Sequence, residues 1–296
     1  MVSYQELESC DEVPSLIQDG NWYLTAWGMG DAVNAILFLE SQSPVEYQIL
    51  CPPRNFSAVK FILDNFCPGE PKCSHVCVYP LQDGYPISQD EVLMSCNGFG
   101  PHLINVAHTY NKLKVVHAPP KDWWRFQSLH TTGILNKILE YERNSPKVED
   151  KTCILFPERG DSFQFPDGFW NEIVDKLKEK DYKIYVNTTD KKDVYKNEKI
   201  FEGTEDLHKP NIADLFDFVV GHKNLLTIGQ RSGIFDMLKY FECRQIIFWC
   251  DVDENNMPDP TRALYESGHF EDDIYTKNNI ELKLSTYNPK VLDLII

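Results

Sequence analysis

The stretch from Asn224 to Cys250 constrains the fold more than any other part of this 296-residue chain. An apolar segment ends near Ile228, and a polar turn, Gly229 to Gly233, follows it. Apolar residues then recur at helical spacing: Ile234, Phe235, Leu238 and Phe241. Another apolar segment, Gln245–Trp249, closes the stretch. This order predicts a strand, a turn, a helix with one buried face and a second strand, which is the repeating unit of an α/β protein.

The turn Gln230-Arg231-Ser232-Gly233 is a candidate anion site. Ser232 is placed to cap the helix, because its hydroxyl can accept a hydrogen bond from an N–H of the first turn. Free N–H groups and the helix dipole favour a phosphate at such an end, and Arg231 adds a positive charge. An ordinary strand-to-helix turn stays open as an interpretation, with Arg231 solvated or paired with Asp236.

Size and composition limit the class of protein. The length suggests about two domains, and 42% hydrophobic with 12% aromatic residues is typical of a globular protein. The net charge of −16 argues against a basic face that wraps nucleic acid and against polybasic attachment to anionic lipid. We therefore expect no nucleic acid among the partners.

The cysteines and the apolar runs bear on the compartment. Nine cysteines, odd in number and irregularly spaced, favour a reducing intracellular environment. The first twenty residues carry several acids and no apolar core, so we expect no signal peptide. No apolar run reaches the ~18 residues of a membrane-spanning helix. The sequence predicts a cytoplasmic protein without an integral membrane segment, and peripheral attachment at the inner membrane face stays open.

The first half, after an irregular lead-in over residues 1–20, opens with an apolar strand, Trp22–Ala26, and a glycine-rich turn. Gly28 and Gly30 permit a tight turn or a close approach to a ligand, and Asp31 follows at the start of a helix. This is the opening unit of a Rossmann-like fold. The third glycine of the dinucleotide fingerprint is absent, so Asp31 as a mere helix cap stays open.

Further strands and helices alternate along the first half, which predicts a mostly parallel sheet with helices on its faces. The predicted strands are Tyr47–Leu50, Val76–Tyr79 and Leu113–His117, and the predicted helices are Ser57–Phe66, a segment after Gly100, and Trp124–Arg143. Four residues of this half could bind zinc by type: Cys67, Cys73, His75 and Cys77. Their spacing is not a usual zinc pattern, and alternation with valines favours a half-buried strand.

The polar segment Lys147–Lys151 predicts a boundary between a first domain, 1–147, and a second, 148–296. The second domain begins with a strand, Thr152–Phe156, and a loop with three polar candidates, Arg159, Asp161 and Ser162. A helix over Phe169–Lys180 follows, and then strands and a helix at Lys183–Asn187, Asn211–Phe218, Gln245–Trp249 and Ile280–Leu284. The last helix, Pro289–Ile296, can pack in this domain or back on the first.

Two Rossmann-like domains without a dinucleotide fingerprint resemble the GT-B fold of nucleotide-sugar glycosyltransferases. The Gly28-x-Gly30-Asp31 turn resembles the N-terminal Gly-x-Gly-Asp turn of bacterial heptosyltransferases, whose Asp is implied to act as catalytic base. The run Ile154–Thr188 is similar to the opening of their donor domain. The turn with Ser232 and Gly233 occupies the place of a Thr-Gly or Ser-Gly that holds the donor diphosphate.

The sequence also departs from that family. Heptosyltransferases usually carry Asp before the Thr-Gly and His shortly after it, where this chain has Arg231 and Asp236. The segment Arg159-Gly160-Asp161 instead resembles the Arg-x-Asp motif of fucosyltransferases that bind GDP-fucose, although their preceding His is Glu158 or Pro157 here. The resemblance therefore supports the fold better than the identity of the donor.

The resemblance implies two Rossmann-like domains that face each other across a cleft, with Asp31 on one wall and Arg159 and Arg231 on the other. Transfer to a hydroxyl needs a base and compensation for the charge on the departing diphosphate. Asp31 can supply the base, and the Arg231 turn with Arg159 and Ser162 the compensation, without a metal cofactor. We predict a glycosyltransferase that takes a nucleotide sugar and a saccharide acceptor of bacterial surface polysaccharide, such as a capsule. Loops near Arg54 and Asn97–His102 are candidates for the acceptor.

Other classes stay open. Asp251-Val252-Asp253 follows a strand and resembles the metal-binding Asp-x-Asp of the other large glycosyltransferase fold, although a solvated acidic turn explains it as well. A non-catalytic protein with two lobes that close on a small ligand would need no base. A phosphosugar epimerase or phosphatase could use the same loops, but no nucleophile is evident in a phosphate loop.

Overall fold

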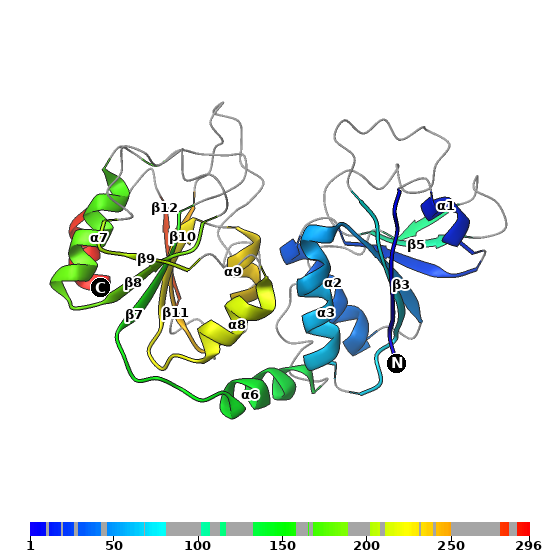
Figure 1. Cartoon of the computed structure of the whole chain (residues 1–296), viewed down its shortest axis with the longest axis horizontal. Helices are drawn as coiled ribbons and strands as arrows, with labels where there is room; N and C mark the ends of the chain where they lie inside the picture. Colours follow the sequence, from blue (N-terminus) through cyan, green and yellow to red (C-terminus); the bar gives the residue numbers. More distant parts are fainter. Residues whose placement is uncertain are drawn as a thin grey trace. The chain divides into compact units, whose positions relative to one another are not determined.

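A computed structural model gives the structure of the chain. It describes residues 1–9, 12–18, 20–26, 29–42, 46–67, 69–80, 102–106, 113–116, 133–157, 165, 168–188, 202–207, 211–230, 232–238, 241–249, 279–283 and 289–296. The chain divides into two compact units, Met1–Tyr141 and Glu142–Ile296, each with its own sheet (Figure 1). This division falls inside helix α6 (Ile134–Asn144), whereas the sequence predicts a boundary just after it.

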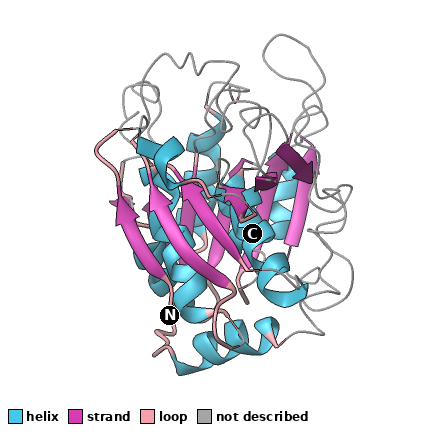
Figure 2. Cartoon of the chain, turned by 90° about the vertical axis from the view of Figure 1, so that its right-hand side faces the viewer, coloured by secondary structure: helices cyan, strands magenta, loops and turns pink. Residues whose placement is uncertain are grey.

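The first unit contains a six-stranded sheet in the order β1-β4-β3-β2-β5-β6. Its strands are β1 (Ser3–Glu6), β2 (Trp22–Thr25), β3 (Tyr47–Cys51), β4 (Cys73–Val78), β5 (His102–Val106) and β6 (Leu113–Val116). Strands β1, β4, β3 and β2 are parallel to one another, and β5 pairs antiparallel with both β2 and β6. Figure 2 shows strands of this sheet side by side with helices behind them. The predicted mostly parallel sheet is confirmed.

Two strands of this sheet, β1 and β5, were not predicted from the sequence. Strand β1 lies in the segment expected to be irregular, and β5 lies in the region after Gly100 expected to be a helix. All four residues of β1 are exposed, so no apolar alternation marks it, and its pairing with β4 makes it a strand. Strand β5 pairs with β6, the next strand along the chain, and with β2, which is distant in sequence.

Helices α1 (Val13–Leu16), α2 (Met29–Gln42) and α3 (Pro53–Asn65) complete the described part of this unit with the first turns of α6. Helices α2 and α3 lie on one side of the sheet in Figure 1. Helix α3 begins earlier than the predicted Ser57 because Pro53 suits the first helical position. Helix α6 confirms the end of the predicted helix Trp124–Arg143, whose residues 124–132 lie outside the described part.

The cysteines of β4 are core residues. Cys73 and Cys77 are buried, and so are Val76 and Val78 on the opposite face, so this end of β4 is buried on both faces rather than half-buried. Burial raises the pKa of the Cys77 thiol to about 11, which keeps it protonated. Within the part of the chain that the structure describes, no three His, Cys, Asp or Glu side chains are grouped to hold a metal ion.

The second unit contains a six-stranded parallel sheet in the order β12-β11-β10-β7-β8-β9. Its strands are β7 (Thr152–Phe156), β8 (Lys183–Val186), β9 (Glu205–Asp206), β10 (Leu226–Gln230), β11 (Arg244–Trp249) and β12 (Asn279–Lys283). Except for the short, exposed β9, each was predicted to within two residues of its start or end. Buried parallel strands give continuous apolar runs that are easy to recognise.

Helices cover both faces of this second sheet. Helix α7 (Phe169–Glu179) and the C-terminal 3-10 turn and helix, Pro289–Val291 and α10 (Leu292–Ile295), lie on one side, and α8 (Ile212–Val220) and α9 (Gly233–Leu238) on the other (Figure 1). The predicted inward face of α7 is confirmed, because all five of its residues are buried: Phe169, Trp170, Ile173, Val174 and Leu177.

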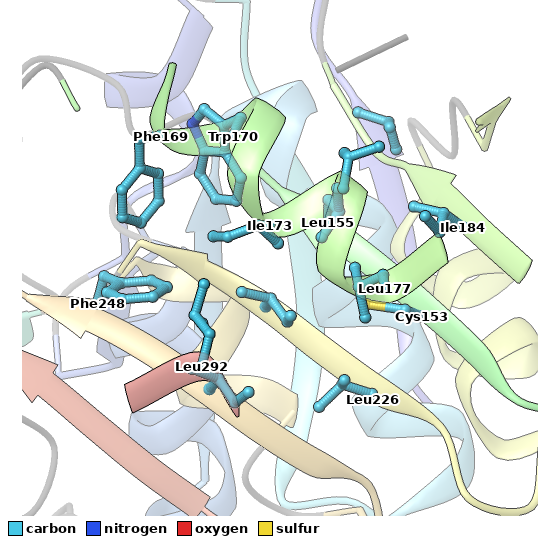
Figure 3. Packing of buried hydrophobic residues seen from close by; sticks show 14 residues of the cluster. Cys153, Leu155, Phe169, Trp170, Ile173, Leu177, Ile184, Leu226, Phe248 and Leu292 are labelled. Carbon is cyan, nitrogen blue, oxygen red and sulfur yellow. The ribbon is translucent and has the colours of Figure 1, made fainter. Parts of the chain in front are cut away.

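The last helix packs within the second unit. Leu292 belongs to the same buried cluster as Leu177 and Phe248, and Figure 3 shows it among side chains from α7 and from the sheet. Asp293 forms an ion pair with Lys176 of α7 at 2.7 Å. The C-terminal segment is therefore part of the core of this unit. None of the helices that the structure describes is both long enough and apolar enough to cross a bilayer.

Candidate functional site

The carboxyl ends of β7 and β10 lie next to each other in the second sheet. The two strands are parallel neighbours, with Phe156 paired to Gly229, and β11 flanks β10 with Phe248 paired to Gln230. The polypeptide that follows each strand therefore leaves the sheet from one edge, where open α/β sheets bind ligands. The predicted neighbourhood of the loop after Phe156 and the turn after Gln230 is consistent with this order.

The turn after β10 is shorter than the sequence predicts. Gly229 and Gln230 belong to β10, and α9 begins at Gly233, so only Arg231 and Ser232 connect strand and helix. Gly229 is in the strand because it leaves room for Phe156 and Phe235, whose atoms would lie within 2.8 Å of a Cβ at position 229. Gln230 is only 1% exposed. The prediction that these two residues form a turn is wrong.

Helix α9 is held firmly by its apolar face. Phe235, Met237 and Leu238 are buried, and the ring of Phe235 packs edge-on against Phe156 with ring centres 5.6 Å apart. The carbonyl of Ser232 accepts a hydrogen bond from the Phe235 N–H at 3.0 Å, which closes the first turn. The contact fixes the start of α9 relative to the end of β7. A capping role of the Ser232 hydroxyl stays a prediction.

Several candidates lie outside the described residues. These are Gly28, Arg159, Asp161, Ser162, Arg231, Asp251 and Asp253, together with the side chains of Asp31 and Asp236. The structure gives the backbone of Asp236 in α9 and of Gly233 at its first position. The ligand contacts proposed for all of these residues stay predictions.

In the first unit, the strand, turn and helix around Asp31 have the predicted order. Strand β2 ends at Thr25 and α2 begins at Met29, so Gly30 and Asp31 are in its first turn. Gly30 is buried. Because β2 is parallel to β3, its end and the start of α2 lie at the carboxyl edge of the parallel part of this sheet. The role of Asp31 as a base, and a cleft between the two units, stay predictions.

A residue that the sequence analysis did not select also lies at this edge. The side chain of Asn55, in the first turn of α3, donates a hydrogen bond from Nδ2 to the carbonyl of Ala26 at 2.7 Å. The sequence signal that could have indicated this residue is the pair Pro52-Pro53. A proline directly after a strand has no N–H, so a carbonyl of the neighbouring strand needs another hydrogen-bond donor. Arg54, a candidate for the acceptor, is exposed beside it, whereas His102 lies in β5 and residues 97–101 lie outside the described part.

The chain was compared with known proteins at three levels. No family model matches it. No curated protein matches it by sequence. Among solved structures, it is similar to E. coli heptosyltransferase WaaC with ADP-2-deoxy-2-fluoro heptose, with a TM-score of 0.51 and 11% identity over 99% of this chain and 98% of that one. A structure of E. coli heptosyltransferase WaaC with ADP has a TM-score of 0.45 at the same identity and coverage.

This likeness extends over both units, because it covers almost the whole of each chain. The aligned residues therefore include both sheets and the helices on their faces. The chain therefore has the α/β fold of a heptosyltransferase, which is the GT-B fold that the sequence resemblance implies.

Proposed function

We propose that the protein is a glycosyltransferase that moves a sugar from a nucleotide-diphosphate donor to a hydroxyl group of a saccharide acceptor. The acceptor class that we propose is a bacterial surface polysaccharide or oligosaccharide. The observation that carries this proposal is the adjacency of β7 and β10, because it starts the Arg159 loop and the Arg231 turn side by side at one edge. A fold shared with a heptosyltransferase that binds a nucleotide sugar supports it.

The donor diphosphate would bind at this edge of the second unit. Its oxygens need positive charge and N–H donors, which Arg159, Arg231, Ser162 and the Ser232–Gly233 backbone can provide. Helix α9 is short, so we assign the larger share of the attraction to the two arginines rather than to the helix dipole. The burial of Phe235 against Phe156 keeps the Arg231 turn at a fixed distance from the end of β7.

The acceptor hydroxyl would lose its proton to Asp31 as it attacks the anomeric carbon of the sugar. The bond from that carbon to the diphosphate oxygen breaks, and the nucleotide diphosphate leaves with its negative charge held by the arginines. We propose that this charge is balanced without a metal ion. Asp251 and Asp253 are the alternative, since a pair of carboxylates could hold a divalent cation on the diphosphate.

A thermal-shift screen tests the donor site first. UDP, GDP, ADP and CMP are added separately to the full chain, and a ligand that binds the folded state raises the apparent melting temperature. We expect a shift with at least one nucleoside diphosphate and none with inorganic phosphate at the same concentration. If none of the four nucleotides raises the melting temperature, the proposal loses its main support.

Turnover then separates an enzyme from a two-lobed binding protein. The matching nucleotide sugar is incubated with oligosaccharide acceptors, and release of the nucleoside diphosphate is followed with and without EDTA. We expect release that depends on the acceptor and persists in EDTA. Binding without release would favour the non-catalytic alternative, and loss of activity in EDTA, restored by Mg²⁺ or Mn²⁺, would favour the Asp-x-Asp alternative.

A further inference from the structure

We propose that Asn55 is a positioning residue for the turn that carries Asp31. This inference rests on the proposed function, in which Asp31 is the base. Asn55 belongs to a different helix from Asp31 and acts on the strand end that precedes the turn. Its side chain replaces a backbone hydrogen bond that the sequence of β3 cannot make.

The missing hydrogen bond follows from the register of β2 and β3. Thr25 pairs with Leu50, and the Ala26 N–H donates to the Leu50 carbonyl at 2.9 Å, so the next step pairs Ala26 with Cys51. In a parallel ladder, the carbonyl of Ala26 would then accept from the N–H of residue 52. Residue 52 is a proline and has no N–H. The ladder therefore stops one bond short at this edge.

Asn55 supplies the donor that Pro52 lacks. Its Nδ2 lies 2.7 Å from the Ala26 carbonyl oxygen, which is well within hydrogen-bonding range. Asn55 is 3% exposed and Ala26 is fully buried, so solvent cannot readily take over this role. A buried carbonyl without a partner is costly, and the side-chain amide removes that cost.

The backbone around Asn55 holds its side chain in place. Pro52 is extended, Pro53 starts α3, and the Asn55 N–H donates to the Pro52 carbonyl at 3.0 Å. Proline fixes the φ angle at both positions and reduces the freedom of this connection. The end of β3, the start of α3 and the end of β2 are thus tied together over a few residues.

The hydrogen bond from Asn55 to Ala26 can affect the position of Asp31, because only a short connection separates Ala26 from the helix that carries Asp31. Ala26 is followed by Trp27 and Gly28, and α2 begins at Met29. A displaced Ala26 carbonyl would move the start of α2, and with it the carboxylate that has to reach an acceptor hydroxyl. A shift of about 1 Å in a reacting group can reduce the rate about 100-fold. Asn55 would therefore affect the rate without contacting a substrate.

The first experiment measures position without any substrate. Amide hydrogen exchange is followed by mass spectrometry in a peptide that covers residues 26–31, in the wild type and in Asn55→Ala. Asn65→Ala is the matched control, because Asn65 of the same helix also donates its Nδ2 to a backbone carbonyl, that of Phe61, at 2.9 Å. We expect at least tenfold faster exchange in this peptide for Asn55→Ala and no change for Asn65→Ala. Unchanged exchange in Asn55→Ala would overturn the proposal.

The second experiment uses the transfer reaction and a double-mutant cycle. We expect Asn55→Ala to lower kcat about tenfold to 100-fold, with the KM for the nucleotide sugar within about twofold of the wild type. In an Asp31→Asn background, Asn55→Ala should lower kcat no further, because the group that it positions is already lost. An equal effect in both backgrounds would mean that Asn55 acts elsewhere and would refute the positioning role.

A rescue variant tests the physical cause. Pro52→Ala restores a backbone N–H at position 52, so the Asn55→Ala/Pro52→Ala double variant should regain slow exchange and most of the lost kcat. Failure of this rescue would contradict the hydrogen-bond explanation.

If Asn55→Ala does not fold, Asn55→Leu replaces it, since its side chain has the same branched shape and carries no N–H group. A wild type without transfer activity would refute the proposed function, while the exchange measurement would still decide the role of Asn55.

Discussion

Gly229 and Phe156 lie so close across β10 and β7 that a Cβ at position 229 would be 2.6 Å from the Phe156 carbonyl oxygen. The same Cβ would lie 2.8 Å from the Cβ of Phe156 and 2.8 Å from the ring of Phe235. The strand on one side and the helix α9 on the other therefore leave room only for a hydrogen atom. This close packing sets the start of the Arg231 turn beside the end of β7.

We expect Gly229→Ala to destabilise the protein by about 1–3 kcal/mol, because the obstructing atoms include backbone that cannot move alone. Urea unfolding followed by circular dichroism measures the change. Gly69→Ala is the control, since a Cβ there meets nothing within 4 Å, and its effect should stay within about 0.5 kcal/mol. Equal effects of the two substitutions would contradict the packing argument.

Gly229 also shows what a single sequence can miss. A glycine and a polar residue after an apolar run are typical of a turn, so the sequence predicts a turn at Gly229 and Gln230. Two of the three obstructing atoms belong to Phe156, which is more than 70 residues away in the chain, so no pattern around Gly229 reports the requirement for glycine. The prediction was wrong because tertiary packing determined the residue type.

Elements with strong periodicity were predictable. The strand Thr152–Phe156 and the buried face of α7 agree with the structure because each is marked by apolar residues in a regular pattern. Strand β1 is polar and exposed, and only its hydrogen bonds to β4 define it. The same holds for the candidate site. The sequence predicts that polar loops follow strands, but only the structure shows that β7 and β10 are neighbours in the sheet.

Leu292 gives a test of how the C-terminal helix contributes to the second unit. Its side chain is 0% exposed in the cluster with α7, so Leu292→Ala should cost about 2–5 kcal/mol of unfolding free energy. The matched control is Leu294→Ala in the same helix, because Leu294 is 84% exposed and its removal should change little. A small effect of Leu292→Ala in urea unfolding would contradict a core position for α10.

Glu142 predicts a dependence of stability on pH. The carboxyl is 5% exposed, and its Oε1 accepts a hydrogen bond from the Glu242 N–H at 2.6 Å. Burial raises the pKa of this group above the ordinary value of 4.5, against the opposing effects of the hydrogen bond and of Lys147. The folded state therefore binds its proton more tightly than the unfolded state. The contribution of Glu142 to the free energy of unfolding is therefore fully present below about pH 4.5, and it is lost as the pH rises through the higher pKa of the folded state.

We expect the free energy of unfolding of Glu142→Gln to lack the decrease that ionisation of Glu142 causes as the pH rises. The free energy of unfolding is measured by urea titration at intervals from pH 4 to pH 8, and the slope against pH is compared with that of the wild type. The wild type should fall more steeply than Glu142→Gln just above pH 4.5. Glu140→Gln, at an exposed position of the same helix, should follow the wild type. Parallel curves for Glu142→Gln and the wild type would show that burial does not perturb this carboxyl.

Arg231 tests the donor site directly. A charge-assisted hydrogen bond to phosphate contributes about 1.5–3 kcal/mol, so Arg231→Ala should raise the Kd of the preferred nucleoside diphosphate about tenfold to 100-fold. Isothermal titration calorimetry measures the change. Arg143→Ala, at an exposed position near the end of α6, is the control and should leave the Kd unchanged. An unchanged Kd in Arg231→Ala would favour a solvated arginine or one paired with Asp236.

Asp31 separates catalysis from binding. If it removes the acceptor proton, Asp31→Asn should lower kcat about 100-fold to 10,000-fold, because the amide cannot act as a base. The Kd of the nucleoside diphosphate should stay within about twofold, since the proposed donor site is in the other unit. Nucleotide release in the presence of acceptor and calorimetric binding give the two values. Asp175→Asn on the exposed face of α7 controls for the loss of one negative charge. A normal kcat in Asp31→Asn would leave Asp31 as a helix cap and would assign the role of the base to another residue.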